Sequence, residues 1–341
     1  MSYKRFDQED VVVSAESITS PVWTGDKTVL NTFFTSSTQT GGTTGDYYYN
    51  IYNTGSALQG SRVQFAIAYG DKKGSGSLSF NNAVPGKAPS STIYGQYRNL
   101  VLGDEDSDFT FGTKTSEHFY ALAVDRAQYK EKLLPGTLDL VLGISGSGQT
   151  LRLTDDSQAN DTIRFNDAGR VYEIVSGSQG SVYDAQNANG YTAFSGSYGK
   201  FLPDVGVILL NGAALDIQTG SQGGIGIGTG RGSNSADLNQ RKLYDAIYFG
   251  GNFRIQSEET ISSNFVFVRA RNSEFNYSTN PSLITGSGEI RHNVMIDTPQ
   301  SYITTIGLYN DNNDLLAVAK LSRPLLKDFT KETLIRVKLD Y

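Results

Sequence analysis

The stretch ITTIGLYNDNNDLLAVAKL, residues 303–321, decides the expected fold. Ile303 to Tyr309 and Leu315 to Leu321 are predicted strands. The five residues between them, Asn310 to Asp314, are all Asn or Asp. These residue types tolerate left-handed backbone angles and hydrogen-bond to their own main chain, so such a cluster between two apolar runs indicates a tight turn. The sequence therefore predicts an antiparallel hairpin here.

The segment from Leu334 to Tyr341 has the period of a strand. Apolar and charged residues alternate along it, which gives one dry face and one wet face: Ile335, Val337 and Leu339 against Arg336, Lys338 and Asp340. The composition of the whole chain also favours strands. Only 38% of residues are hydrophobic and 19% are charged, and the chain has 37 Gly and 20 Tyr. Many short strands joined by polar turns have this composition. We expect an all-β protein of several small antiparallel β-sandwich or barrel-like domains, with one or two short helices.

With 341 residues and 37.0 kDa, the chain exceeds one typical core. We expect an N-terminal arm and β domain over residues 1–112, a central β domain over 113–262 and a C-terminal β domain over 263–341. Parts of the first and last segments are candidates to share one sheet. A short helix is predicted near residues 236–249, with Asn234 or Ser235 as its cap.

Three local predictions can be compared with the structure. Trp23, the one tryptophan, is expected to anchor the N-terminal arm on the body of the protein. The segment from Ser77 to Gly103 is predicted as short strands around a Pro/Gly loop. The Tyr-rich segment from Asp46 to Tyr52 is a candidate ligand-binding loop.

The charge and the absence of cysteine exclude several classes of function. The net charge is −6 and no cluster of Lys or Arg stands out, so we expect no nucleic-acid partner. No cysteine means no disulfide, no thiolate nucleophile and no Cys-based metal site. The first residues lack the apolar core of a signal peptide, and no apolar run could span a bilayer. We therefore expect synthesis in a cytoplasm and no membrane insertion.

No set of residues predicts catalysis. His118 and His292 are far apart, and no G-x-S-x-G motif is present. The glycine run from Gly223 to Gly232 does not fit the dinucleotide-binding spacing, which favours a plain loop. Acidic residues cluster at Asp104-Glu105-Asp106-Asp108, Asp155-Asp156 and Glu258-Glu259. A glycosidase needs two carboxylates that converge across a groove, which a sequence alone does not show. The first cluster lacks the Gly and the distal Glu of a calcium-binding loop, and we expect it to be a solvated turn. We expect no catalytic residues, no metal ligands and no cofactor.

Several sequence segments, taken in their order along the chain, resemble a known family. They are SEHFYALAVDRAQYKEKLLPGTLDL (residues 116–140), YGKFLPDVGVILLNGAALD (198–216), the long block from Asn264 to Phe329 that contains FNYSTNPS, and the closing LIRVKLDY. Together these phrases resemble a structural protein of T-even-like contractile-tailed phages, especially those of marine cyanobacteria. The resemblance covers about the last two thirds of the chain.

The resemblance implies a non-enzymatic virion component, a tail or baseplate subunit made in the host cytoplasm and present in multiple symmetric copies. Such a protein assembles with other tail proteins through strand edges and extended arms. The N-terminal arm, the strand with Arg269 and Arg271, and the terminal strand are candidate docking elements, and Phe275 and Tyr277 are candidate plugs. The alternative is a receptor- or glycan-binding β-sandwich of a tail fibre. A cell-wall-degrading tail enzyme is a third reading.

Overall fold

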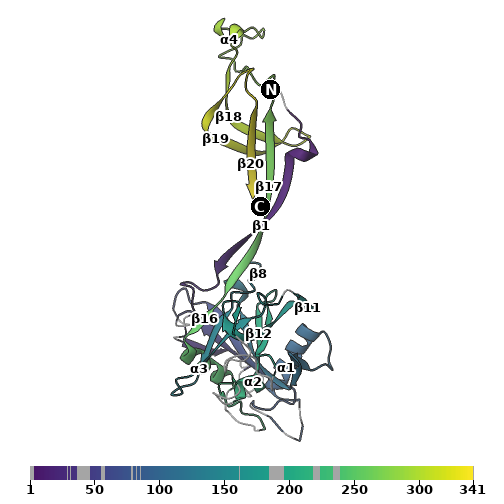
Figure 1. The fold of residues 1–341 in the computed structure, drawn as a ribbon, viewed down its shortest axis with the longest axis vertical. Helices are drawn as coiled ribbons and strands as arrows, with labels where there is room; N and C mark the ends of the chain where they lie inside the picture. The colour runs from purple at the N-terminus through teal and green to yellow at the C-terminus, as the bar shows by residue number, and fades with distance from the viewer. Residues whose placement is uncertain are drawn as a thin grey trace. The chain divides into compact units, whose positions relative to one another are not determined.

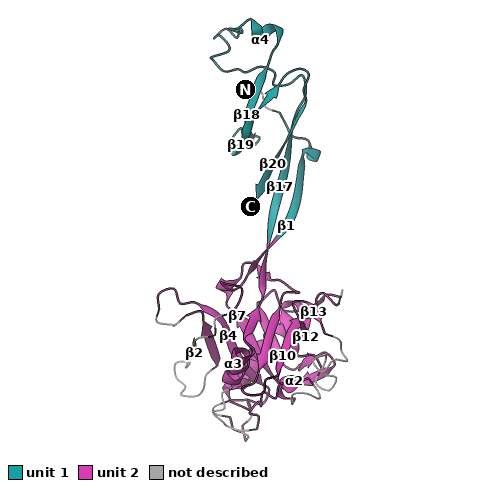
Figure 2. Cartoon of the chain, turned by 60° about the vertical axis from the view of Figure 1, so that its left-hand side comes forward, with its two compact units in different colours: residues 1–17, 260–341 teal, residues 18–259 magenta. Residues whose placement is uncertain are grey.

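The computed structural model describes residues 4–28, 30, 32–36, 47–54, 58–77, 80–81, 83–84, 86–160, 162–183, 196–217, 223–232 and 239–340. It confirms the all-β class, with 44% of residues in strands and 14% in helices. The chain divides into two compact units (Figure 2): unit 1 is residues 1–17 and 260–341, and unit 2 is residues 18–259. This differs from the three expected segments. The expected boundary at Thr113 lies inside unit 2, because strands before and after it pair in one sheet.

Unit 1 combines the two ends of the chain. Its main sheet has the strand order β1 (Val11–Pro21), β17 (Gln256–Ala270) and β20 (Thr333–Asp340). Figure 1 shows these three strands side by side. A separate hairpin is formed by β18 (Ser301–Tyr309) and β19 (Leu315–Lys327). The first and last segments of the sequence therefore do share a sheet. Two short helices complete the unit: η1 (Gln8–Asp10) and α4 (Val294–Asp297).

The predicted hairpin at residues 303–321 is confirmed, and the turn chemistry explains it. Asn310 Oδ1 accepts hydrogen bonds from the N–H of Asn312 at 3.0 Å and of Asp314 at 2.8 Å. Asn313 has φ of 63°, the left-handed conformation that asparagine tolerates. The side chain of Asn310 thus holds the turn closed, as the sequence predicted.

Unit 2 contains one sheet of twelve strands, and every strand pair that the structure records in it is antiparallel. Its central path runs β16-β9-β10-β12-β14-β15-β7-β4-β3-β2, and β11 and β13 pair with β12. The strands are β2 (Thr32–Ser36), β3 (Tyr48–Tyr52), β4 (Val63–Asp71), β7 (His118–Val124), β9 (Asp139–Gly143), β10 (Thr150–Asp155), β11 (Arg164–Asn166), β12 (Gly169–Ser178), β13 (Ser181–Val182), β14 (Gly199–Leu202), β15 (Val207–Asn211) and β16 (Asn252–Arg254). Outside it lie β5 (Phe109–Phe111), β6 (Lys114–Ser116), β8 (Lys132–Leu133) and η2 (Arg126–Gln128).

The sheet of unit 2 is buried on both faces. Along β7, Tyr120 and Leu122 belong to one hydrophobic cluster, which includes α3 (Asn239–Gly250). Phe119 and Ala121 belong to a second cluster, on the face covered by α1 (Pro89–Leu102). A strand buried on both faces is apolar throughout, which explains the continuous apolar run of β7. Trp23 joins the first cluster with 2% of its surface exposed, as its predicted anchoring role requires.

Helix α1 corrects the prediction of strands and a loop between Ser77 and Gly103. Its buried residues Ile93, Tyr94, Tyr97 and Val101 follow the helical period and pack beside β4. Pro89 stands at its start, and Gly103 ends it in the left-handed conformation with φ of 68°. Residues of high β-propensity gave the wrong prediction, because burial against the sheet decides this segment.

The predicted helix near residues 236–249 corresponds to α3, which begins at Asn239. Its predicted caps, Asn234 and Ser235, lie outside the described residues. The short helix α2 (Gly212–Asp216) follows β15 directly. Within the described part of the chain, no helix is long and apolar enough to cross a membrane.

Candidate functional site

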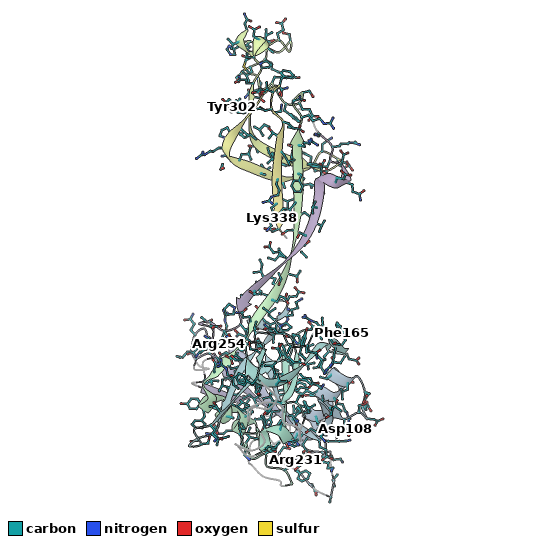
Figure 3. The ribbon with its side chains drawn as sticks, viewed as in Figure 1. Asp108, Phe165, Arg231, Arg254, Tyr302 and Lys338 are labelled. Atoms are coloured by element: carbon teal, nitrogen blue, oxygen red, sulfur yellow. The ribbon has the colours of Figure 1, made fainter. Side chains whose placement is uncertain are left out.

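Unit 1 exposes an unusual number of large apolar side chains. Among the described residues, unit 1 exposes Phe6, Val11, Val12, Val13, Phe275, Tyr277, Val294, Ile296, Tyr302, Tyr309, Leu315, Leu316, Val318, Leu325, Phe329 and Leu334. Unit 2, with the longer chain, exposes Ile18, Leu58, Val84, Leu100, Ile163, Phe165, Tyr248 and Phe249. Figure 3 shows Tyr302 in unit 1 and Phe165 in unit 2 as examples. Exposed apolar patches of this kind mark interaction surfaces.

The core of unit 1 is small. Its buried cluster consists of Val266, Ile306, Leu308 and Val337, contributed by β17, β18 and β20. Strand β19 adds partly buried side chains, whereas no side chain of β1 joins this cluster among the described residues. The hairpin β18–β19 therefore covers only the part that β17 and β20 form in the main sheet of unit 1, to which β8 also belongs through its pairing with β17.

The uncovered part of that face carries Val11 and Val13 of β1. The ion pair between Glu16 and Lys338, at 3.1 Å, places these two side chains on the same face of the sheet. Since side chains alternate along a strand, Val11 and Val13 lie on the opposite face, the one that also carries Val337. Val13 is nevertheless 68% exposed. Unit 1 thus leaves an apolar strip beside its own core.

The hairpin β18–β19 is apolar on both of its faces. Ile306 and Leu308 point into the core, and the residue between them is Gly307. A Cβ atom at Gly307 would lie 2.8 Å from the Tyr309 ring and 3.3 Å from Leu315, so both side chains lie over this glycine on the outer face. Val318, the strand partner of Gly307, is 58% exposed. This outer face has no counterpart in unit 1 to cover it among the described residues.

A buried lysine organises the segment that contains FNYSTNPS. The Lys327 side chain is fully buried, and its Nζ donates to Asn276 Oδ1 at 2.6 Å and to the carbonyl oxygens of Asn272 and Asp328 at 3.1 and 2.9 Å. Three acceptors satisfy its three N–H groups. Asn276 is itself buried, and the flanking Phe275 and Tyr277 are exposed. The two predicted plugs are thus presented on a fixed loop.

Three predicted docking elements lie together in unit 1. The N-terminal arm supplies β1, Arg269 lies on β17 and Arg271 directly follows it, and the terminal strand is β20. Lys4 reinforces this arrangement, because its Nζ donates to the carbonyl oxygen of Arg269 at 2.6 Å and pairs with Glu274 at 3.3 Å. Sequence reasoning did not predict Lys327 or the apolar outer face of the hairpin.

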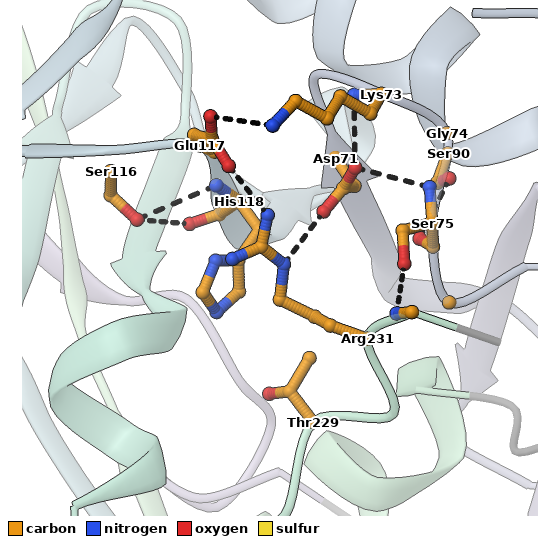
Figure 4. A network of polar contacts seen from close by, with 12 residues as sticks. Asp71, Lys73, Gly74, Ser75, Ser90, Ser116, Glu117, His118, Thr229 and Arg231 are labelled. Atoms are coloured by element: carbon orange, nitrogen blue, oxygen red, sulfur yellow. Dashed lines mark hydrogen bonds and ion pairs between the residues drawn. The ribbon is translucent and has the colours of Figure 1, made fainter. Parts of the chain in front are cut away.

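The main polar network of unit 2 surrounds Arg231 (Figure 4). Its Nε donates to Asp71 at 2.9 Å and its Nη2 to Glu117 at 2.8 Å. Lys73 also pairs with Glu117, at 3.2 Å. The hydrogen bond from Arg231, followed by that from Lys73, holds the pKa of the Glu117 carboxyl below its ordinary value. The network attaches the glycine run to the ends of β4 and β7, which supports the prediction that this run is a loop.

The two histidines lie in different units. His118 is buried, and its Nε2 lies 3.4 Å from Asp216 Oδ2. Burial alone raises the pKa of Asp216, but contact with His118 and the N–H of Thr229 lowers it below the ordinary value. His292 lies in unit 1, so no site brings the two together within one unit.

The acidic clusters contact backbone N–H groups and lysine side chains. Asp104 Oδ1 accepts from the N–H groups of Asp106 and Ser107 in a turn. Asp155 and Asp156 accept from the N–H groups of Gly136 and Glu173, and Glu258 and Glu259 pair with Lys132 and Lys130. Within the described ranges, no three His, Asp or Glu side chains are placed to hold a metal ion.

The Tyr-rich candidate loop is a strand in the structure. Residues Tyr48–Tyr52 form β3, which pairs with β2 and β4 on its two sides, and Asp46 lies outside the described residues. Tyr49 and Ile51 of this strand are buried in the core, and Tyr48, Asn50 and Tyr52 are half-buried.

Comparison of the chain with protein-family models, with curated proteins and with solved structures finds no match.

Proposed function

We propose that this chain is a non-enzymatic structural protein of a virion, a tail or baseplate subunit of a contractile-tailed phage. The observation that carries the proposal is the surface of unit 1, which exposes many large apolar side chains and buries few. Such a surface is unfavourable in water and becomes favourable once partners cover it. The sequence resemblance supports the same role, since its longest block, residues 264–329, lies in unit 1.

In this role unit 1 is the assembly module and unit 2 is a rigid body with a core of its own. Other tail proteins dock on the exposed strands and on the loop with Phe275 and Tyr277. The protein works in several symmetric copies in the virion tail after synthesis in the host cytoplasm. Strand edges supply backbone hydrogen bonds to a partner, and the apolar side chains supply burial.

Immunogold electron microscopy of intact phage particles tests this proposal. An antibody against the chain, validated on the free protein, is expected to label the tail, with label at its distal end for a baseplate subunit. Label at the neck or along the tube would keep the structural role but change its location. Particles without label, confirmed by the absence of its peptides in mass spectra of purified virions, would contradict the proposal.

One observation favours glycan binding as a second candidate function. At the end of α3, Tyr248 is 53% and Phe249 48% exposed, and Tyr248 stacks on Tyr244 with ring centroids 6.3 Å apart. Exposed, supported aromatic rings suit the apolar face of a sugar. If this function is correct, labelled protein binds host cells and Tyr248→Ala weakens the binding, while Phe165→Ala does not. Equal binding by both variants, or none by the parent, would rule this site out.

A further inference from the structure

The main sheet of unit 1 has two open edges. Strands β1 and β20 each have β17 as their one strand neighbour among the described residues. Soluble proteins protect such edges with Pro, Lys or inward-pointing charges, because an open edge can pair with another chain. From Val11 to Ala15 the edge of β1 has none of these, and its proline, Pro21, is the last residue of the strand. The edge of β1 is therefore ready to pair.

The charges on the two edges differ in sign. Between Phe6 and Asp26 the chain has no Lys or Arg, and the β1 side carries Glu9, Asp10 and Glu16. Pairing of β1 with β1 of a second copy would bring these acids together, and like charges facing each other destabilise a strand pair. Strand β20 instead carries Arg336 and Lys338. Lys338 already pairs with Glu16 and Asp340 of its own chain, so Arg336 is the cation that would meet Glu9 and Asp10 of a neighbouring copy. Charge complementarity thus favours β20 as the partner of β1.

The apolar side chains agree with this choice. Val11 and Val13 lie on the face that carries Val337 of β20, which is part of the core. A neighbouring β20 placed beside β1 would bring its own Val337 and the hairpin that covers it next to the apolar strip. The uncovered part of the face would then be buried between copies.

We propose that unit 1 associates head to tail with a second copy of this chain, with the outer edge of β1 in one copy paired to the outer edge of β20 in the next. Each contact then joins the open edge of β1 in one copy to the open edge of β20 in the next, so a single type of contact pairs both edges. A head-to-tail contact closes into a ring when the rotation between copies permits it. The inference rests on the assembly role proposed for unit 1 and names the partner at that surface.

Cross-linking of cysteine variants tests the pairing, because the chain has no cysteine of its own. Ser14→Cys on β1 and Leu334→Cys on β20 share a sheet face with Glu16 and Lys338, respectively. The two single variants, one of them carrying an affinity tag, are mixed and treated with a short bis-maleimide reagent. Each variant has one thiol, so every cross-link joins different copies.

The expected product is a covalent pair of one Ser14→Cys chain and one Leu334→Cys chain, while each variant alone stays uncross-linked. Light scattering of the parent protein is expected to give a multiple of the monomer mass that rises with concentration. Cross-linking of Ser14→Cys alone would overturn the proposal in favour of a β1–β1 contact. A monomer at all concentrations, or multimers without the mixed product, would also overturn it.

Charge reversal gives an independent test with a matched control. Arg336→Glu places an acid opposite the acidic β1 edge, so the association constant is expected to fall roughly fivefold. Arg323→Glu, at an exposed position of β19 in the separate hairpin, is expected to leave it unchanged. Equal effects of the two variants would contradict the proposed edges.

Failure of this inference and failure of the proposed function are distinguishable. Particles that contain the chain while the purified chain gives no mixed cross-link would retain the virion role and remove the self-pairing. The mixed cross-link together with particles that lack the chain would retain the self-pairing and remove the virion role.

Discussion

Units 1 and 2 are both built mainly from antiparallel strands, but unit 2 buries most of its apolar side chains and unit 1 exposes many of them. Unit 2 buries both faces of its sheet under helices and loops, in two large clusters. Unit 1 has one small cluster, to which four buried residues belong. Every residue of β1 is exposed, although three consecutive valines begin the strand.

The difference shows that strand sequence alone does not decide burial. Strands β4 and β7 in unit 2 and β19 in unit 1 are similarly apolar, yet the first two have layers on both faces and β19 has a layer on one. Hydrophobic stabilisation scales with the apolar area removed from water, so unit 2 obtains much of it within one chain. In the proposed assembly, unit 1 obtains the rest when another molecule covers it.

The largest effect is expected from a core substitution in unit 2. Phe119 is fully buried and contacts Phe109 with ring centroids 4.8 Å apart. Phe119→Ala is expected to lower the free energy of unfolding by about 4 kcal/mol, because it leaves a cavity under α1. Urea titration measures this loss, and Phe165→Ala, at a 73% exposed position, is the control with little effect. A loss as small as that of the control would mean that unit 2 lacks the tight core described.

A smaller effect is expected at the polar network of unit 2. Arg231→Ala leaves the fully buried Asp71 carboxylate without its cationic partner. Among the described residues, the N–H groups of Lys73 and Ser75 still donate to it. The expected cost is about 2 to 3 kcal/mol, since an unpaired buried charge is unfavourable. Arg241→Ala, which removes an exposed ion pair, is expected to cost less than about 0.5 kcal/mol. Equal costs would show that the network does not hold the glycine run.

In unit 1 the corresponding core substitution is expected to have a local effect. Val337→Ala removes two methyl groups from the small cluster and is expected to cost about 1.5 kcal/mol. Hydrogen exchange is expected to accelerate in β17, β18 and β20 and to stay unchanged in unit 2. Val318→Ala, on the exposed outer face, serves as the control. Faster exchange across both units would contradict their independence.

The smallest effect depends on pH. Burial raises the pKa of Asp155, so the unfolded chain releases this proton at a lower pH than the folded chain. Stability contributed at this site therefore decreases as pH rises from about 4 through the raised pKa. Relative to the parent, Asp155→Asn is expected to gain unfolding free energy across that window. Asp104→Asn is expected to change in the opposite direction and by less, since hydrogen bonds from Ser107 lower the pKa of the exposed Asp104.

The parts of the fold that local chemistry decides were predicted from the sequence. The turn at Asn310 to Asp314 is closed by its own side chains. Helix α1 was missed because Tyr, Ile and Val favour strands on average, and only packing against β4 reverses that preference.

The candidate site was predicted only in part, because several of its contacts join residues that are far apart in sequence. The docking elements and the sheet shared by the two ends of the chain were predicted, but the individual contacts were not, as the pair of Glu16 and Lys338 illustrates. The burial of Lys327 gave no local signal, because its three acceptors come from two separate segments. The Asp71–Arg231 contact spans 160 positions and was equally invisible.

Hydrogen exchange of the full chain over a range of protein concentrations tests most directly whether unit 1 is completed by association while unit 2 is complete by itself. The account predicts that amides of β1 and β20 become protected as the concentration rises, and that exchange in the sheet of unit 2 does not change. Exchange in β1 and β20 that is slow at high dilution, or that never varies with concentration, would contradict it.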